Sequence, residues 1–94
     1  MINHDELLSL LRRRAREGAT MVELVDLVHE MTDTPPYARG CVGLPFAHAF
    51  RLKPADFSNF VFACVLFGDG ATMSVAEAER LFRIRMSELG FAPS

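Results

Sequence analysis

Three helix-start signals of one kind constrain this chain more than any other feature. Each combines a short polar residue with a glutamate three positions later: Asn3 with Glu6, Thr20 with Glu23, and Ser74 with Glu77. At this spacing the first side chain accepts a hydrogen bond from the glutamate backbone N–H, while the glutamate side chain reaches back toward the start of the helix. Apolar residues at helical spacing follow each signal. The pattern therefore predicts three helices, one after each signal.

The same segments carry helix-stop signals. The stop residues are Gly18 after the first segment, Thr34 with Pro35 after the second, and Gly90 after the last. Glycine readily adopts the left-handed conformation that ends many helices, and proline disfavours a helical conformation for the residue before it. Gly90 followed by Phe91 predicts a Schellman end. Because few residues separate the first two helices, we expect them to form a helical hairpin.

The stretch from Pro35 to Gly43 connects the second predicted helix to the rest of the chain. It contains two prolines and two glycines, which favour turns. It also holds the apolar residues Cys41 and Val42, so we expect an ordered loop rather than a flexible linker. No feature of this stretch marks a domain boundary, and we expect residues 1–94 to form a single helical domain.

Two further segments begin with proline. Pro45 suits the first turn of a short helix, and Pro54 opens a longer segment that Gly68 would close after about four turns. The apolar residues of this longer segment suit one helical face: Phe57, Phe60, Val61, Cys64 and Phe67. Residues 60–67 alone suit a buried strand equally well, so helix and strand both remain open for residues 57–67, and we favour the helix. The predicted fold is all-α, a compact bundle of four to five helices with an ordered central loop that contains proline and glycine.

The composition argues against several classes of protein. The longest apolar run, residues 60–67, has eight residues, whereas a membrane-spanning helix needs roughly 20. We therefore expect no membrane partner. The sequence begins without a basic segment followed by an apolar run, which predicts no signal peptide and a cytoplasmic location. Cys41 and Cys64 do not suit a secreted disulfide framework, and we expect both to be reduced.

Candidate catalytic and metal-binding residues form no known motif. The segment from His29 to Asp33 differs from the zinc-protease motif because Asp33 stands where the second histidine is needed. The spacing of Cys41, His48 and Cys64 matches no zinc finger or ribbon. No third group can be identified that would orient Cys41 and His48 for nucleophilic catalysis. We therefore expect no enzyme activity, no catalytic residue, no cofactor and no metal ion.

One face of the second predicted helix is acidic. Its members are Glu23, Asp26, Glu30 and Asp33. These carboxylates would bind a divalent cation only if another segment supplied further oxygen ligands. A solvated surface is the simpler interpretation of an amphipathic helix, and we favour it while the cation site stays open.

A basic cluster lies near the end of the first predicted helix. Its members are Arg12, Arg13, Arg14 and Arg16. Guanidinium groups around a helix end can contact several phosphates, so a small nucleic-acid-binding protein is the alternative function. The formal net charge of the chain is −2, and no aromatic residues interleave the cluster. We therefore favour a solvated helix end whose cations complement the helix dipole.

Apolar residues are abundant for so short a chain. Half of the 94 residues are hydrophobic, and seven of the eight phenylalanines lie between Phe46 and Phe82. A small domain has limited interior, so we expect some of this apolar surface to bind another chain. The leading hypothesis is a non-enzymatic interaction or regulatory module that binds a protein partner, or itself as a homodimer, through a phenylalanine-rich helical surface. The predicted contact residues are Tyr37, Phe46, Phe50, Phe57 and Phe60.

Overall fold

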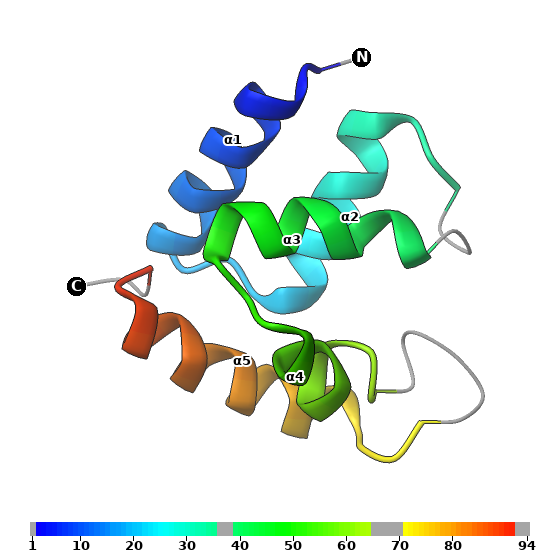
Figure 1. Ribbon diagram of the computed structural model, residues 1–94, viewed down its shortest axis with the longest axis vertical. Coiled ribbons are helices and arrows are strands. Elements are labelled where there is room, and N and C mark those ends of the chain that lie inside the picture. The colour runs from blue at the N-terminus through cyan, green and yellow to red at the C-terminus, as the bar shows by residue number, and fades with distance from the viewer. Residues whose placement is uncertain (1, 36–38, 65–70, 92–94) are drawn as a thin grey trace.

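The computed structural model describes residues 2–35, 39–64 and 71–91 (Figure 1). Its helical elements are α1 (His4–Arg16), α2 (Met21–Thr32), the 3₁₀ helix η1 (Arg39–Val42), α3 (Gly43–Phe50), α4 (Pro54–Asp56), the π-helical turn η2 (Phe57–Val61) and α5 (Val75–Leu89). Within these residues the chain forms no strand, and its β structure is limited to an isolated bridge between Cys64 and Met73. The prediction of an all-α bundle of four to five helices is confirmed.

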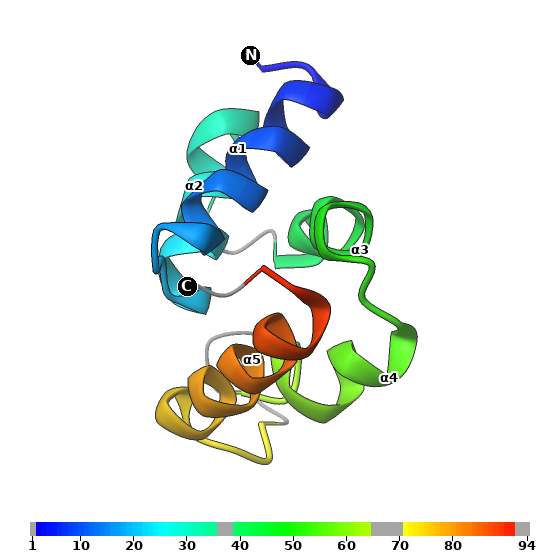
Figure 2. The ribbon, with the colours of Figure 1, turned by 90° about the vertical axis from the view of Figure 1, so that its left-hand side faces the viewer.

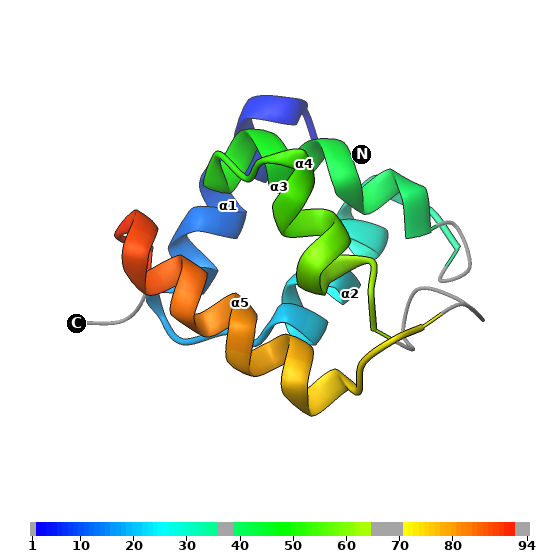
Figure 3. The same cartoon turned by 60° about the horizontal axis from the view of Figure 1, so that its bottom comes forward.

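The helices pack in a compact arrangement. Figure 2 shows α1 and α2 side by side, with α5 below them, and α3 packs against α1. Figure 3 shows the α4–η2 segment beside α5, and these two elements are in contact. The radius of gyration is 12.2 Å, which is the value expected for a compact domain of this length.

The predicted helix starts are present. Side-chain oxygens of Asn3, Thr20 and Ser74 accept hydrogen bonds from the backbone N–H groups of Glu6, Glu23 and Glu77, at 2.9, 3.2 and 3.2 Å. At Thr20 the arrangement is reciprocal, because the Glu23 carboxylate also accepts the Thr20 N–H at 2.9 Å. The other two glutamates differ from the expected capping box. The Glu6 carboxylate accepts from the Asn3 amide group, and the Glu77 carboxylate accepts from Arg80.

The predicted glycine stops are also present. Gly90 has a positive φ of 83°, and the N–H of Phe91 donates to the carbonyl of Met86 at 2.8 Å, which is the Schellman arrangement. The same arrangement ends α1, where Gly18 has a φ of 98°. Helix α2 ends at Thr32, and Asp33 adopts the left-handed conformation just before Thr34 and Pro35.

The fourth predicted helix is wrong for residues 62–64, which are not helical. The N–H of Phe62 donates to the carbonyl of Phe57 at 2.8 Å, so the last turn is a wide π turn that does not continue. The carbonyl of Ala63 accepts hydrogen bonds from the N–H groups of Thr72 and Met73. That carbonyl is therefore engaged with a distant segment and does not extend a helix. Residues 65–68 of the predicted helix lie outside the described residues.

Phenylalanine rings form the centre of the core. Phe82 of α5 contacts three other rings, with centroid distances of 6.0, 6.1 and 6.2 Å to Phe46, Phe50 and Phe60. Phe91 extends the cluster through Phe50, at 5.4 Å. These rings join α3, η2 and α5, so one aromatic cluster fixes elements that are distant in sequence.

A carboxylate joins α5 to the start of α2. Glu79 of α5 accepts hydrogen bonds from the backbone N–H groups of Met21 and Val22, at 2.8 and 2.9 Å. These N–H groups belong to the first turn of α2, where no carbonyl of the same helix is available to accept them. The negative charge also complements the positive end of the helix dipole. Glu79 therefore stabilises the packing of α5 against α2.

Candidate interaction surface

Three of the five predicted contact residues lie in the core. Phe46 and Phe50 are fully buried, and Phe60 is 5% exposed. Phe57 is half-buried, and Tyr37 lies outside the described residues. The prediction assumed that so many rings exceed the capacity of a small bundle. The fold accommodates Phe46, Phe50 and Phe60 by packing them around Phe82, so these three offer no surface to a partner in this structure.

Other apolar side chains are exposed. The large ones are Leu44, Ile84 and Phe62, with exposed fractions of 61%, 47% and 40%. The Phe62 ring stacks on Phe57, with centroids 5.1 Å apart and planes 28° apart. Its far edge lies against Gly43, where a Cβ atom would be only 3.4 Å from the ring. Since Gly43 directly precedes Leu44, we group Gly43, Leu44, Phe57 and Phe62 as the α3–η2 face.

The helical geometry of α3 explains the exposure of Leu44. Phe46, Ala49 and Phe50 are buried and define the inner side of the helix. Leu44 and His48 lie four residues apart on the opposite side, and both are exposed. The exposure of Leu44 could have been predicted from the sequence, because the helical spacing of the inner residues places Leu44 on the opposite side of the helix. No comparable signal existed for Phe62, because its exposure depends on where η2 ends.

Ile84 is a different case. It lies on the outer side of α5, with Arg80 and Glu88 four residues away on either side, and both of these are exposed. A single apolar side chain among charged neighbours is common on protein surfaces. Ile84 therefore serves as a matched control for Leu44 and not as part of a proposed site.

The structure disperses the predicted basic cluster. Arg12 points toward α3, where its Nε and Nη2 atoms donate to the carbonyls of Ala49 and His48 at 2.7 and 3.1 Å. The guanidinium of Arg16 lies 5.2 Å from the ring centre of Phe91. These two side chains thus hold α1 to other parts of the bundle.

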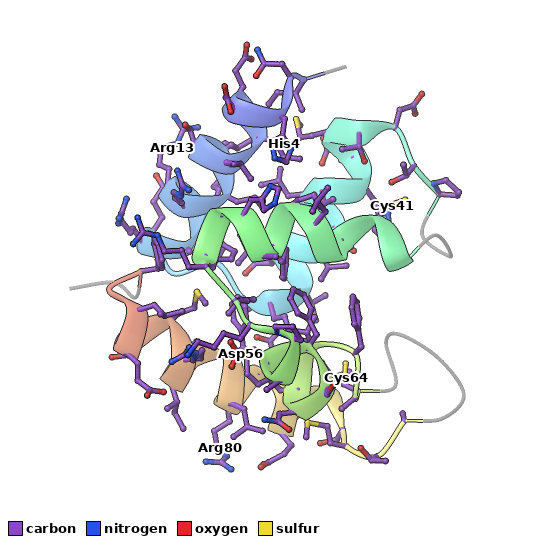
Figure 4. All side chains as sticks on the ribbon, viewed as in Figure 1. His4, Arg13, Cys41, Asp56, Cys64 and Arg80 are labelled. Carbon is purple, nitrogen blue, oxygen red and sulfur yellow. The ribbon has the colours of Figure 1, made fainter. Side chains whose placement is uncertain are left out.

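The other two arginines of the cluster, Arg13 and Arg14, are exposed. Figure 4 shows Arg13 on the side of α1 that faces away from α3. Arg14 lies near Glu23, and the pKa of Glu23 is lowered, chiefly by its hydrogen bonds with Thr20 and further by the charge of Arg14. The four arginines therefore do not form one continuous basic surface.

Two of the three arginines of α5 are likewise engaged with acidic residues. Arg80 pairs with Glu77, and this interaction lowers the pKa of Glu77. Arg85 pairs with Asp56 at 3.3 Å, which links α5 to α4. Paired guanidinium groups are less available to phosphate than unpaired ones.

The acidic face of α2 has the properties of a solvated surface. Glu23, Asp26 and Glu30 are exposed, and together with Arg14 they line a shallow depression. Asp33 is separate, since it occupies the left-handed position that ends α2. In the part of the chain that the structure describes, no three histidine, cysteine or acidic side chains are grouped so that they could hold a metal ion.

The two cysteines have different environments. Cys41 lies in η1 and is exposed, whereas Cys64 is buried beside the bridge to Met73 (Figure 4). His48, considered with Cys41 in the sequence analysis as a candidate nucleophile–base pair, contacts His4 through its Nδ1 atom. The geometry therefore gives no support to a Cys41–His48 catalytic pair.

A groove of about 410 Å³ lies between the α1–α2 turn and α5. Gly18, Thr20, Glu79 and Arg83 are among the residues that line it. Both carboxylate oxygens of Glu79 already accept hydrogen bonds from α2. The acidic group in this groove thus has a structural role.

Among the described residues, no helix combines the length and apolar character needed to cross a membrane. Comparison of the chain with models of protein families, with curated proteins and with solved structures found no match.

Proposed function

We propose that this protein is a non-enzymatic interaction module that binds a protein partner through the α3–η2 face. The observation that supports this proposal is the exposure of two large apolar side chains, Leu44 and Phe62, with the Phe62 ring stacked on Phe57 and lying against Gly43, the neighbour of Leu44 in the chain. Contact between apolar side chains and water is unfavourable. Burying these side chains against apolar groups of another chain would therefore lower the free energy. The contact residues proposed are thus Leu44, Phe57 and Phe62 rather than the buried rings.

The composition of this surface suits the centre and rim of an interface. Full burial of a leucine or phenylalanine side chain contributes about 1.5–3 kcal/mol, so Leu44 and Phe62 are the candidate anchors. Exposed polar residues lie nearby in the sequence: His48, Arg51, Ser58 and Asn59. Apolar anchors within a polar rim are the usual organisation of protein interfaces.

The first test uses a second copy of the chain as the partner. Sedimentation velocity should be measured over a range of concentrations for the wild type and for two matched variants, Leu44→Asp and Ile84→Asp. If the protein self-associates through this face, Leu44→Asp should be monomeric while Ile84→Asp behaves like the wild type. If the wild type self-associates, equal association of both variants would contradict binding through this face, provided that circular dichroism shows both to be helical.

A monomeric wild type would direct the search to another protein. A photoreactive amino acid would then be placed at position 44 or at position 84 in the native cell. The proposal expects a cross-linked product of defined mass from position 44 that is absent from position 84. The same products from both positions, or none from position 44, would argue against it.

Nucleic-acid binding is the weaker alternative. Arg12 and Arg16 of the predicted cluster contact other parts of the bundle, which leaves Arg13 and Arg14 as its exposed members for binding phosphate. Two phosphate contacts predict that the logarithm of the binding constant falls with the logarithm of the salt concentration with a slope of only about −1.8. A fluorescence titration with a labelled DNA duplex measures that slope. A slope of this size that Arg13→Ala and Arg14→Ala each reduce by about 0.9 would favour this alternative.

A further inference from the structure

Two histidines that are distant in sequence meet at the junction of α1 and α3. His4 is the first residue of α1, and His48 lies near the end of α3. The Nε2 atom of His4 and the Nδ1 atom of His48 are 3.0 Å apart. The rings are nearly perpendicular, with an angle of 85° and a centroid distance of 5.2 Å. Both residues are exposed, and Figure 4 shows His4 on the side of α1 that faces α3.

The surrounding structure holds the two histidines in place. Arg12 donates to the carbonyls of His48 and Ala49, so the backbone that carries His48 is fastened to α1. Beneath this junction, Leu7 and Leu11 of α1 and the inner residues of α3 belong to the same buried core. A ligand that bridges the rings would therefore find them already close together, and little ordering would oppose its binding.

We propose that His4 and His48 form a zinc site, in which the His4 Nε2 and His48 Nδ1 atoms bind one Zn²⁺ ion. Zinc binds imidazole nitrogen at about 2.0–2.1 Å, and tetrahedral coordination therefore separates two such nitrogens by about 3.3 Å. The observed separation of 3.0 Å is a few tenths of an ångström shorter. Both exposed rings would turn so that the two nitrogen lone pairs converge on the ion instead of facing each other.

The proton balance of the proposed site is simple. In the hydrogen bond between the rings, one of the two facing nitrogens carries the shared proton. When Zn²⁺ binds two neutral imidazoles, that proton moves through solvent to the other nitrogen of its own ring. Each ring then donates one lone pair to the metal and keeps one N–H group. No net proton is released where both rings are already neutral.

The proposed site is open, since the protein supplies two ligands and water completes the tetrahedron. Zinc sites with free coordination positions exchange those ligands, in contrast to closed structural sites with four protein ligands. His48 shares the outer side of α3 with Leu44, one helical turn away. The inference stands independently of the proposed function because its test requires no partner.

Sequence analysis predicted no metal site. It could not have identified this pair, because the two histidines are 44 residues apart and no local motif contains both. The packing of α3 against α1 brings them together.

The test is isothermal titration of the untagged chain with zinc sulfate at pH 7.5, with the unfolding temperature measured in parallel. We expect one Zn²⁺ per chain and an unfolding temperature that rises with zinc and returns to its starting value after a chelator is added. Magnesium, which prefers oxygen ligands, should have no effect. An absence of stoichiometric zinc binding by the wild type would overturn the proposal.

Three variants identify the ligands. His4→Gln and His48→Gln should each weaken zinc binding by more than the roughly 10-fold to 100-fold that loss of a supporting side chain costs at metal sites. Cys41→Ser should bind as the wild type does, because the exposed thiol is not part of the site. Unchanged binding in His48→Gln would show that the N-terminal segment binds zinc without α3, and it would contradict the proposed site.

Discussion

The α1–α2 hairpin and the α3–η2 segment (residues 43–61) differ in how their helices are held in position. In the hairpin, both helices begin at residues whose side chains accept hydrogen bonds from the first turn, Asn3 and Thr20. Neither α3 nor η2 has a side-chain cap of this kind. Their positions depend instead on rings that pack around Phe82. Local sequence thus determines the hairpin, whereas contacts between distant residues determine the α3–η2 segment.

The largest effect is expected at the aromatic core. Phe82→Ala should lower the free energy of unfolding by about 3–5 kcal/mol, because the variant loses the ring contacts that join α3, η2 and α5. Urea unfolding followed by circular dichroism measures this loss. Phe62→Ala is the control on the α3–η2 face, and it should lower the free energy of unfolding by only about 1 kcal/mol. Equal costs for the two variants would remove the distinction between core and surface rings.

The carboxylate that joins α5 to the hairpin should rank next. Glu79→Gln keeps the length of the side chain but replaces one accepting oxygen by an NH₂ group, which would face the backbone N–H of either Met21 or Val22 and could not accept from it. We expect a loss of about 1–3 kcal/mol in urea unfolding. Glu77→Gln is the control on the same helix, because its exposed pairing with Arg80 should contribute little. A silent Glu79→Gln variant would mean that solvent replaces the carboxylate at the start of α2.

A local cap should matter less than a core ring. Thr20→Ala removes the hydroxyl that accepts the Glu23 N–H, and we expect it to cost about 1 kcal/mol. Thermal unfolding of this variant beside Phe82→Ala measures the comparison directly. A cost as large as that of the core variant would show that the hairpin start, and not the aromatic cluster, dominates stability.

The smallest effect is expected in the dependence of stability on pH. Hydrogen bonds with Thr20 lower the pKa of Glu23 below its ordinary value of 4.5. The folded state therefore favours the ionised carboxylate, so this contribution is present above pH 4.5 and is lost as the pH falls through the lowered pKa. Replacement by glutamine should reduce the acid sensitivity of unfolding in this range. If urea midpoints of the wild type and Glu23→Gln change in parallel below pH 4.5, the pairing at Thr20 does not affect stability.

The same contrast explains which features could be predicted from sequence. Helix starts at Asn3, Thr20 and Ser74 depend on neighbours within a few residues, and the structure confirms them. The end of η2 depends on the engagement of the Ala63 carbonyl by Thr72 and Met73, which no local pattern encodes. The exposure of Phe62 depends on that end, and the burial of Phe46, Phe50 and Phe60 depends on their packing around Phe82, which is also distant in sequence. This is why sequence reasoning assigned partner contacts to rings that the core contains.

The unequal environments of the two cysteines give the chain a built-in reporter. A thiol reagent can reach Cys41 in the folded state, but it can reach the buried Cys64 only when the surrounding structure opens. The first modification therefore attaches a label two residues before Gly43, beside the α3–η2 face, without any engineered residue. The rate of the second modification measures how often the molecule exposes its interior, so one reaction mixture records both surface accessibility and internal opening.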